Sequence, residues 1–306
     1  MSVQNYENQV RLLLDIMPAI ADESCFAMHG GTAINLFVRD MPRLSVDIDL
    51  TYVLIEDRAT TLANIRQALA SIQTRLQTQS GVKTILDEEH VKLRCISKNA
   101  EVKIEVNTTM RGTLTDPVRM RLSRSAELRF DRFAETSIVP VGQLYGGKTC
   151  AALARQHPRD LFDIKHMLDA QGFTDEIKRG FLLCLLSSDK PINDMIRPTL
   201  LDQHQAMTKR FSGMTAVPFS YEDFEETRRI LIRTVNECLN ANDREFLLTF
   251  KAGNPDWIKY GFPEFEKFPG VQWKLKNIQT LKTFNPSNHQ LQLDRLRESL
   301  TSKKNR

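Results

Sequence analysis

The alternation of hydrophobic and polar positions divides the chain into a first part that mixes strands with helices and a second part that is helical. Short runs of β-branched and alternating residues predict strands at residues 24–29, 44–53, 91–96 and 101–107. Apolar positions spaced three and four residues apart predict helices at residues 1–22, 141–156, 161–171, 175–186, 221–240 and 243–251. We therefore expect an α/β core with a mixed sheet at residues 1–140 and a helical C-terminal domain at residues 141–306.

One aromatic-rich stretch, residues 253–286, does not follow this pattern. We expect it to be irregular. Its aromatic side chains either form a satellite cluster that holds the last helices or provide a platform on which nucleic-acid bases stack. Both interpretations stay open from the sequence, and the tail at residues 302–306 is expected to fray.

A glycine pair, Gly30 and Gly31, separates the first predicted strand from a helix expected over residues 32–38. Glycines let the backbone approach a ligand closely, and the following helix start presents unpaired N–H groups and a positive dipole end. Such a turn suits a triphosphate. The preceding His29 has no derivable role in this and is expected to be buried and bonded to backbone.

Two carboxylates follow on the next predicted strand, within the pattern Arg43-x-Ser45-x-Asp47-x-Asp49. Residues two apart on a strand point to the same face, so Asp47 and Asp49 lie about 7 Å apart and repel each other. Oxygen-only ligands of this kind favour Mg²⁺ or Mn²⁺. An Asp-x-Asp pair is also common on solvated sheet faces, but its position after a glycine turn favours a nucleotide site and indicates a nucleotidyltransferase.

A third carboxylate is needed if the site is to hold two metal ions. The predicted hairpin of residues 91–107 offers Glu105 on its second strand, with Glu101 as the reserve. The alternative for Glu105 is the solvated face of an edge strand.

A second group of charged residues spans the end of one predicted helix and the start of the next: Lys148, Arg155, Arg159, Asp160 and Asp163. Lys148 and Arg155 share one helix face, and Asp160 falls in the first turn of the following helix. In the functional interpretation Lys148 neutralises charge on the β- and γ-phosphates, and Asp160, or else Asp163, orients or deprotonates the attacking hydroxyl. In the structural alternative these residues form a helix-start carboxylate and local salt bridges.

Together these motifs resemble a known family. Gly-Gly-Thr-Ala from Gly30 and Arg-x-Ser-x-Asp-Ile-Asp-Leu from Arg43, followed by Lys-x6-Arg-x3-Arg-Asp-x2-Asp from Lys148, are similar to the AbiEii/AbiGii nucleotidyltransferases. These are toxins of bacterial toxin–antitoxin systems and of abortive infection in phage defence. The resemblance implies a polymerase-β-like nucleotidyltransferase core with a helical C-terminal region, and Mg²⁺-dependent transfer of nucleotides from an NTP. It also implies a cognate antitoxin, often a winged-helix transcriptional repressor.

The resemblance assigns roles to individual positions. Gly30 and Gly31 match the phosphate-binding turn, where relatives often have Gly-Ser, so the hydroxyl here comes from Thr32 or from Ser45. The metal pair is matched by Asp47 and Asp49, the opening lysine of the second motif by Lys148, and its acidic catalytic residue by Asp160. Arg43 is expected to assist in phosphate binding.

Composition and charge add little. The 306 residues carry a net charge of +4 and 41% hydrophobic residues, typical of a globular protein. A basic stretch at residues 111–132, with Arg119, Arg121 and Arg124, either contacts an RNA backbone together with Arg155 and Arg159 or forms a solvated, salt-bridged face. The odd number of widely spaced cysteines and the absence of a signal peptide or membrane-spanning run lead us to expect a cytoplasmic protein with reduced thiols and no membrane partner.

The sequence therefore predicts a Mg²⁺-dependent enzyme that transfers nucleotides from an NTP to RNA. The resemblance favours the 3′ end of tRNA as acceptor, with arrest of translation and growth. Two alternatives remain: transfer of AMP or phosphate to a protein on the same scaffold, and a non-catalytic binding role.

Overall fold

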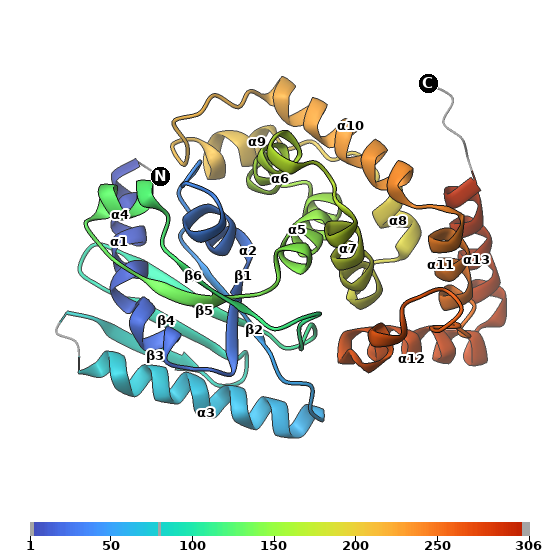
Figure 1. Ribbon diagram of the computed structural model, residues 1–306, viewed down its shortest axis with the longest axis horizontal. Helices are drawn as coiled ribbons and strands as arrows, with labels where there is room; N and C mark the ends of the chain where they lie inside the picture. Colours follow the sequence, from blue (N-terminus) through green and yellow to red (C-terminus); the bar gives the residue numbers. More distant parts are fainter. Residues whose placement is uncertain (1–2, 79–80, 302–306) are drawn as a thin grey trace.

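A seven-stranded mixed sheet lies at the centre of the first half of the protein, with strand order β3-β4-β5-β2-β1-β7-β6 (Figure 1). The structure, a computed structural model, describes residues 3–78 and 81–301. The strands are β1 (Phe26–His29), β2 (Ile48–Tyr52), β3 (Lys83–Asp87), β4 (Lys92–Ile96), β5 (Glu101–Asn107), β6 (Val118–Arg121) and β7 (Glu135–Ile138). Strand β2 runs antiparallel to β1 and parallel to β5. The predicted mixed α/β fold is confirmed.

The two faces of the central strands differ in polarity, and this places the site. Ile48 and Leu50 of β2 are buried, whereas Asp49 between them points to the other face. The register sets Asp49 opposite His29 of β1 and opposite Glu105 of β5. Three polar side chains from three adjacent strands therefore meet on one face of the sheet.

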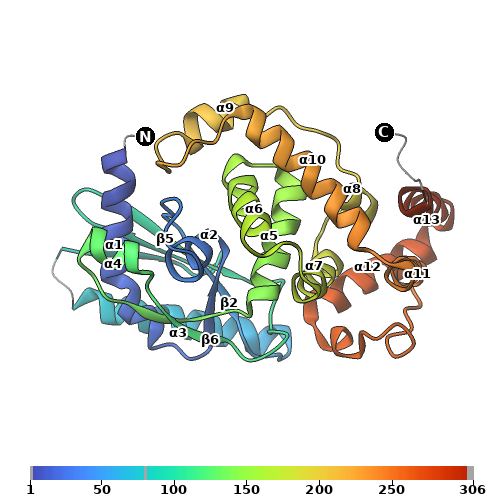
Figure 2. The same cartoon turned by 45° about the horizontal axis from the view of Figure 1, so that its top comes forward.

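Each face of the sheet is covered by helices. The apolar face packs against α1 (Val3–Ala21) and α3 (Arg58–Gln77). The polar face is bordered by a single turn of helix, α2 (Gly30–Thr32), by the π-helix η1 (Ala33–Val38) and by α5 (Val141–Arg155) (Figures 1 and 2). A short helix, α4 (Arg124–Phe130), lies between β6 and β7.

Only helices follow β7 in the described part of the chain. They are α5, α6 (Pro158–Gln171), α7 (Asp175–Ser187), α8 (Ile192–Ile196), α9 (His204–Ala206), η2 (Met207–Phe211), α10 (Tyr221–Cys238), α11 (Ala241–Lys251), η3 (Pro263–Lys267), α12 (Pro269–Phe284) and α13 (Pro286–Thr301). Helices α11 and α13 lie at the end of the molecule away from the sheet (Figure 1). The last strand ends at Ile138 and α5 begins at Val141, while the division into two domains at residue 140 stays a prediction.

Helix α5 crosses α7 unusually closely because both helices carry glycine at the contact. A Cβ atom on Gly142, Gly146 or Gly180 would overlap backbone atoms of the facing helix. The glycines therefore fix the position of α5, the helix that borders the polar face of the sheet.

Two predictions about the elements were wrong. The strand expected at 44–53 is shorter, because the backbone N–H of Leu44 donates to the carbonyl of Met214, 2.7 Å away in the helical part, and leaves the sheet. The aromatic stretch expected to be irregular is helical from Pro269, where proline occupies the first turn of α12 and Val271, Leu275 and Ile278 form its buried face.

The aromatic side chains of this stretch form a packed cluster. Phe262, Phe265 and Phe268 are buried, and Phe262 packs against Phe246 of α11 with ring centroids 4.7 Å apart. This supports the satellite-cluster interpretation for these residues. Trp273 and Phe284 are the exceptions, since 47% and 83% of them are exposed. The tail at 302–306 lies outside the described residues.

The cysteines and the membrane prediction can be compared with the structure directly. All five cysteines are free, and burial raises the pKa of Cys95 and Cys184 to about 12. Among the helices of the described chain, none has the length and apolar character needed to cross a bilayer.

Candidate functional site

The glycine turn lies directly against the carboxylate strand. Gly30 has a φ of +76°, a conformation that side chains disfavour, and a Cβ there would overlap Asp49 Oδ2. A Cβ on Gly31 would lie 2.7 Å from Arg43 Nη2 and 3.0 Å from Ser45 Oγ. Both glycines are therefore required by the close approach of protein side chains, quite apart from any ligand.

A hydroxyl pair ties this turn to the chain that leads into β2. Thr32 is fully buried, and its Oγ1 donates to the carbonyl of Asp47 at 2.5 Å and lies 3.0 Å from Ser45 Oγ. Ser45 lines an open chamber beside Asp47 and Asp49, whereas Thr32 lies behind it. Of the two candidate hydroxyls, Ser45 is therefore the one in position to meet a phosphate.

Asp47 and Asp49 project into the same chamber, as the spacing predicts. Partial burial and the neighbouring charge of Asp49 raise the pKa of Asp47. Glu105, the register partner of Asp49, also lines the chamber, but its carboxylate forms an ion pair with Lys92 at 2.9 Å. The site therefore concentrates negative charge on two strands.

The donor set fits a divalent cation that is completed by substrate oxygens. In the described part of the chain, no three acidic, histidine or cysteine side chains come close enough to hold an ion by themselves. Magnesium ions are commonly bound through one or two carboxylates together with substrate phosphates. Asp47 and Asp49 supply that pair, and the third-ligand role of Glu105 stays a prediction.

Asp163 is the centre of a buried ion network. It accepts from Arg43 Nε and Nη2, both at 2.7 Å, and from Asn35 Nδ2 at 2.9 Å, and Lys148 Nζ lies 2.9 Å from its Oδ2. Burial by itself raises the pKa of Asp163, but the charges of Arg43 and Lys148 outweigh it and hold the pKa below its usual value. The guanidinium of Arg43, predicted to bind phosphate, is thus held by a carboxylate in this structure.

Asp160 is held in the same way on the other side of Lys148. Lys148 Nζ lies 3.0 Å from Asp160 Oδ1, and Arg155 Nε lies 2.5 Å from Asp160 Oδ2. Burial opposes ionisation here too, but Lys148 and Arg155 hold the pKa of Asp160 well below its usual range. A buried carboxylate with a lowered pKa is a weak proton acceptor, so the geometry favours Asp160 as a residue that positions Lys148 and Arg155.

These side chains enclose a chamber of about 230 Å³. Among the described residues, five cationic and four acidic side chains line it. The cations are Arg43, Lys103, Lys148, Arg155 and Arg159, and the acids are Asp47, Asp49, Glu105 and Asp160. Arg159 Nη1 lies 3.9 Å from Asp47 Oδ2, and 61% of the Arg155 side chain is exposed. The chamber combines a carboxylate pair for a cation with basic groups for an anion.

Three of the predicted RNA-binding arginines lie elsewhere. Arg119 and Arg121 are on β6, the edge strand separated from β2 by β1 and β7, and Arg124 begins α4. Arg119 pairs with Glu135 at 3.0 Å, and Arg121 lies over the ring of Phe133. The ion pair of Arg119 matches the salt-bridged interpretation of the basic stretch, and the role of these arginines in RNA binding stays a prediction.

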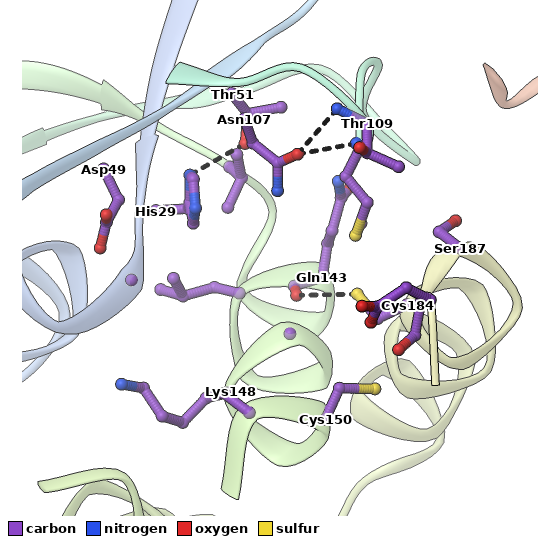
Figure 3. A pocket seen from close by; sticks show the side chains of 18 of the residues that line it. His29, Asp49, Thr51, Asn107, Thr109, Gln143, Lys148, Cys150, Cys184 and Ser187 are labelled. Carbon is purple, nitrogen blue, oxygen red and sulfur yellow. Dashed lines mark hydrogen bonds between the residues drawn. The ribbon is translucent and has the colours of Figure 1, made fainter. Parts of the chain in front are cut away.

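Sequence reasoning overlooked two residues of the site and misjudged a third. Lys103 could have been found, because it is two residues before Glu105 and so shares its strand face. Asn35 carries no local signal, since its partner Asp163 is 128 residues away. His29 bonds to a side chain, Thr51 Oγ1 at 3.0 Å, where a backbone partner was expected, and burial lowers its pKa (Figure 3).

Comparison with known proteins identifies the family and the fold. Residues 11–277 match the sequence profile of the family described as nucleotidyl transferase AbiEii toxin, type IV toxin–antitoxin system. A solved structure with the same fold is MenT4, a nucleotidyltransferase toxin from Mycobacterium tuberculosis H37Rv. It has a TM-score of 0.59 and 13% sequence identity, and the alignment covers 79% of this chain and 86% of that chain. A comparison with curated proteins finds no match. Since the family profile spans most of the chain, the protein belongs to the AbiEii nucleotidyltransferase toxins of type IV toxin–antitoxin systems.

Proposed function

We propose that the protein transfers nucleotides from an NTP to the 3′ end of an RNA in a Mg²⁺-dependent reaction. The observation that carries the proposal is the chamber in which Asp47 and Asp49 face Lys148, Arg155 and Arg159. A carboxylate pair alone fits many cation sites, and a basic cluster alone fits many anions. Their combination fits a triphosphate with its metal ion.

The basic side chains are suited to hold the phosphates. Lys148 is fixed by Asp160 and Asp163, both fully buried, so its ammonium is positioned before substrate binds. Arg159 reaches Asp47 only at 3.9 Å, so its guanidinium can turn to a phosphate. The hydroxyl of Ser45 and the backbone of Gly31 complete this wall. We infer that Arg43 acts indirectly, by holding Asp163 and through it Lys148.

Asp47 and Asp49 would hold the metal ion, with Glu105 beside them. When bound, Mg²⁺ screens the phosphate charge and stabilises the oxygens of an in-line displacement. The acceptor oxygen bonds to the α-phosphorus, the bond from that phosphorus to the pyrophosphate oxygen breaks, and pyrophosphate leaves. The hydroxyl proton passes to solvent water in this step, and we infer that Asp160, which is ion-paired with Lys148 and Arg155, acts by positioning these two side chains.

Family membership supports the rest of the proposal. An antitoxin partner and an NTP substrate follow from membership in a toxin–antitoxin family. That the acceptor is the 3′ end of tRNA, that translation stops, and that the antitoxin is a winged-helix repressor rest on the resemblance to relatives with these properties.

The test is incubation of the purified protein with total tRNA, Mg²⁺ and each α-³²P-labelled NTP in turn, followed by denaturing electrophoresis. We expect RNase-sensitive label on tRNA with wild type and none with Asp49→Asn. Glu101→Gln is the matched control, because Glu101 is a carboxylate of the same sheet that pairs with Arg94 at 2.8 Å outside the chamber. It should behave as wild type.

Other results would redirect the assignment. Label that resists RNase and migrates with protein, or label from γ-³²P NTP alone, would show AMP or phosphate transfer to protein. Equal labelling by Asp49→Asn and wild type would remove the carboxylate pair from the mechanism.

A further inference from the structure

A second cavity of about 520 Å³ opens beside the phosphate chamber, between the sheet and helices α5 and α7 (Figure 3). Its size is that of a small-molecule site. Its lining is mixed, with apolar side chains such as Val139 and Leu144 beside many polar ones, whereas the phosphate chamber is almost wholly charged. We propose that this cavity holds the nucleoside of the NTP, an inference that rests on the proposed function.

The two spaces are continuous at the catalytic strand. Gly31, Asp49, Lys148 and Arg155 line both of them. A nucleotide with its β- and γ-phosphates among the basic groups and its sugar and base in the second cavity would have its α-phosphorus at this junction, beside Asp49. A nucleoside triphosphate bound in this way would contact the charged lining with its phosphates and the mixed lining with its nucleoside.

Gly147 of α5 is the first residue that points to a ligand. Glycine inside a helix is less stable than alanine, so it needs a reason. For Gly142 and Gly146 the reason is the contact with α7, but a Cβ on Gly147 would meet only Cys184 Sγ at 3.8 Å, which is ordinary contact. Gly147 lines the cavity. Packing within the protein does not require this glycine, whereas room for a ligand would.

Asn107 at the end of β5 is the second residue that indicates a ligand in this cavity. Its Oδ1 accepts from the backbone N–H groups of Thr109 at 3.0 Å and Met110 at 2.9 Å, which fixes the orientation of the amide. The Nδ2 group is thereby directed into the cavity as a donor, without a partner in the described part of the chain (Figure 3). Asn107 therefore offers a fixed hydrogen bond to an acceptor atom of the base or the sugar, and we assign it a role in nucleoside specificity.

Two polar side chains near Asn107 are already paired. Gln143 accepts from the N–H of Leu114 and donates to the carbonyl of Gly112, and His29 pairs with Thr51. The hydroxyl of Thr109 also lines the cavity. Asn107 therefore adds a donor of fixed orientation to this wall, which can select a nucleoside by its shape and by its polar contacts.

The experiment measures binding by calorimetry in the presence of Mg²⁺, with two probes. One is an NTP with a non-cleavable methylene between its α- and β-phosphorus atoms, in each of the four base forms, and the other is inorganic tripolyphosphate, which has no nucleoside. Gly147→Leu fills the cavity, and Gly147→Ala adds a single methyl group at the same position as an intermediate step. Asn107→Asp keeps the oxygen that holds Thr109 and Met110 but replaces the free donor with an acceptor.

We expect the NTP analogue to bind Gly147→Leu at least about tenfold more weakly than it binds wild type, and to bind Gly147→Ala more weakly by a smaller factor, because alanine adds only one methyl group. Tripolyphosphate should bind both variants as it binds wild type. Asn107→Asp should reduce the ratio of analogue to tripolyphosphate affinity by roughly 2- to 10-fold, and unequally among the four bases. Because both probes carry the phosphate charge, this ratio cancels the repulsion from the new carboxylate.

Three results would overturn the inference. Affinity of Gly147→Leu for the analogue equal to that of wild type would show that the nucleoside lies elsewhere. A raised KM for RNA with unchanged KM for NTP in Gly147→Leu would assign the cavity to the acceptor. If wild type bound neither probe, the proposed function itself would be wrong. Normal binding of tripolyphosphate, in contrast, keeps the proposed function in place, so that a loss or retention of analogue binding tests the nucleoside cavity alone.

Discussion

Replacing Asp163 with alanine should destabilise the protein severely, although no substrate need touch this residue. Its side chain is fully buried, and the Arg43 and Lys148 side chains that pair with it are 2% and 5% exposed. Without Asp163, Lys148 still forms its ion pair with Asp160, but the Arg43 guanidinium retains only its hydrogen bond to the carbonyl of Leu44 at 2.9 Å. The substitution therefore leaves a buried, almost unpaired cation.

The magnitude follows from that uncompensated charge. Breaking a buried ion pair by removing one partner costs about 3–5 kcal/mol. The total stability of a typical domain is about 5–15 kcal/mol, so Asp163→Ala removes a large share of it. Replacing both partners, as in Arg43→Met with Asp163→Leu, removes the buried charges together and should cost several kcal/mol less than the sum of the two single changes.

Urea unfolding followed by tryptophan fluorescence at pH 7 measures these differences. The folded-state pKa of Asp163 is lowered, so its contribution to stability is present above the unfolded-state value of about 4 and is lost as the pH falls below it. The gap between wild type and Asp163→Ala should therefore narrow in acid. A loss below about 1 kcal/mol at pH 7, or additive single and double variants, would refute the account of the network.

Three further predictions concern the chamber. Gly30→Ala forces an alanine to a φ of +76° against Asp49, so the variant should lose about 1–2 kcal/mol of stability and nearly all transfer activity. Thermal melting and tRNA labelling measure the two losses, and labelling at the wild-type level would contradict the turn geometry. Burial and the charge of Asp49 raise the pKa of Asp47, so Mn²⁺ binding should begin to weaken at a pH above the ordinary aspartate pKa of about 4 as the solution is acidified. Electron paramagnetic resonance measures the bound Mn²⁺. A loss of binding only below that pH would show that the two carboxylates behave as if in open water. Arg155→Ala should weaken tRNA binding and reduce by about 1 the slope of the logarithm of the binding constant against the logarithm of the salt concentration. Arg119 pairs with Glu135 away from the chamber, so Arg119→Ala should leave both quantities unchanged. Equal effects of the two substitutions would support the basic stretch as an RNA-binding surface.

The sequence predicted the parts of the fold that are set by local pattern. The strand carrying Asp49, the hairpin carrying Glu105, and the break between α5 and α6 at Pro158 all follow from alternation and from proline. Helix α3 carries an equally regular buried face, at Thr61, Ile65, Ala68, Leu69, Ile72 and Leu76, but was overlooked. The local sequence pattern is therefore sufficient to predict this helix.

The candidate site was predictable in its residues but not in its contacts. Lys148, Asp160 and Asp163 were recognised as one group, yet the partner of Asp163 is Arg43, 120 residues earlier. No periodicity encodes such a pair, because it depends on how α6 packs against the glycine turn. The same holds for the free Nδ2 of Asn107, which is defined only once the cavity wall exists.

The glycine contact between α5 and α7 has a consequence for how this toxin can be inactivated. Lys148 and Arg155 are carried by α5, so any residue that pushes α5 away from α7 displaces them together. Gly142, Gly146 and Gly180 each exclude a Cβ by backbone overlap. In a genetic selection for cells that survive the toxin without its antitoxin, escape alleles should therefore accumulate at Asp47 and Asp49 and also at these glycines, where the altered proteins keep both aspartates.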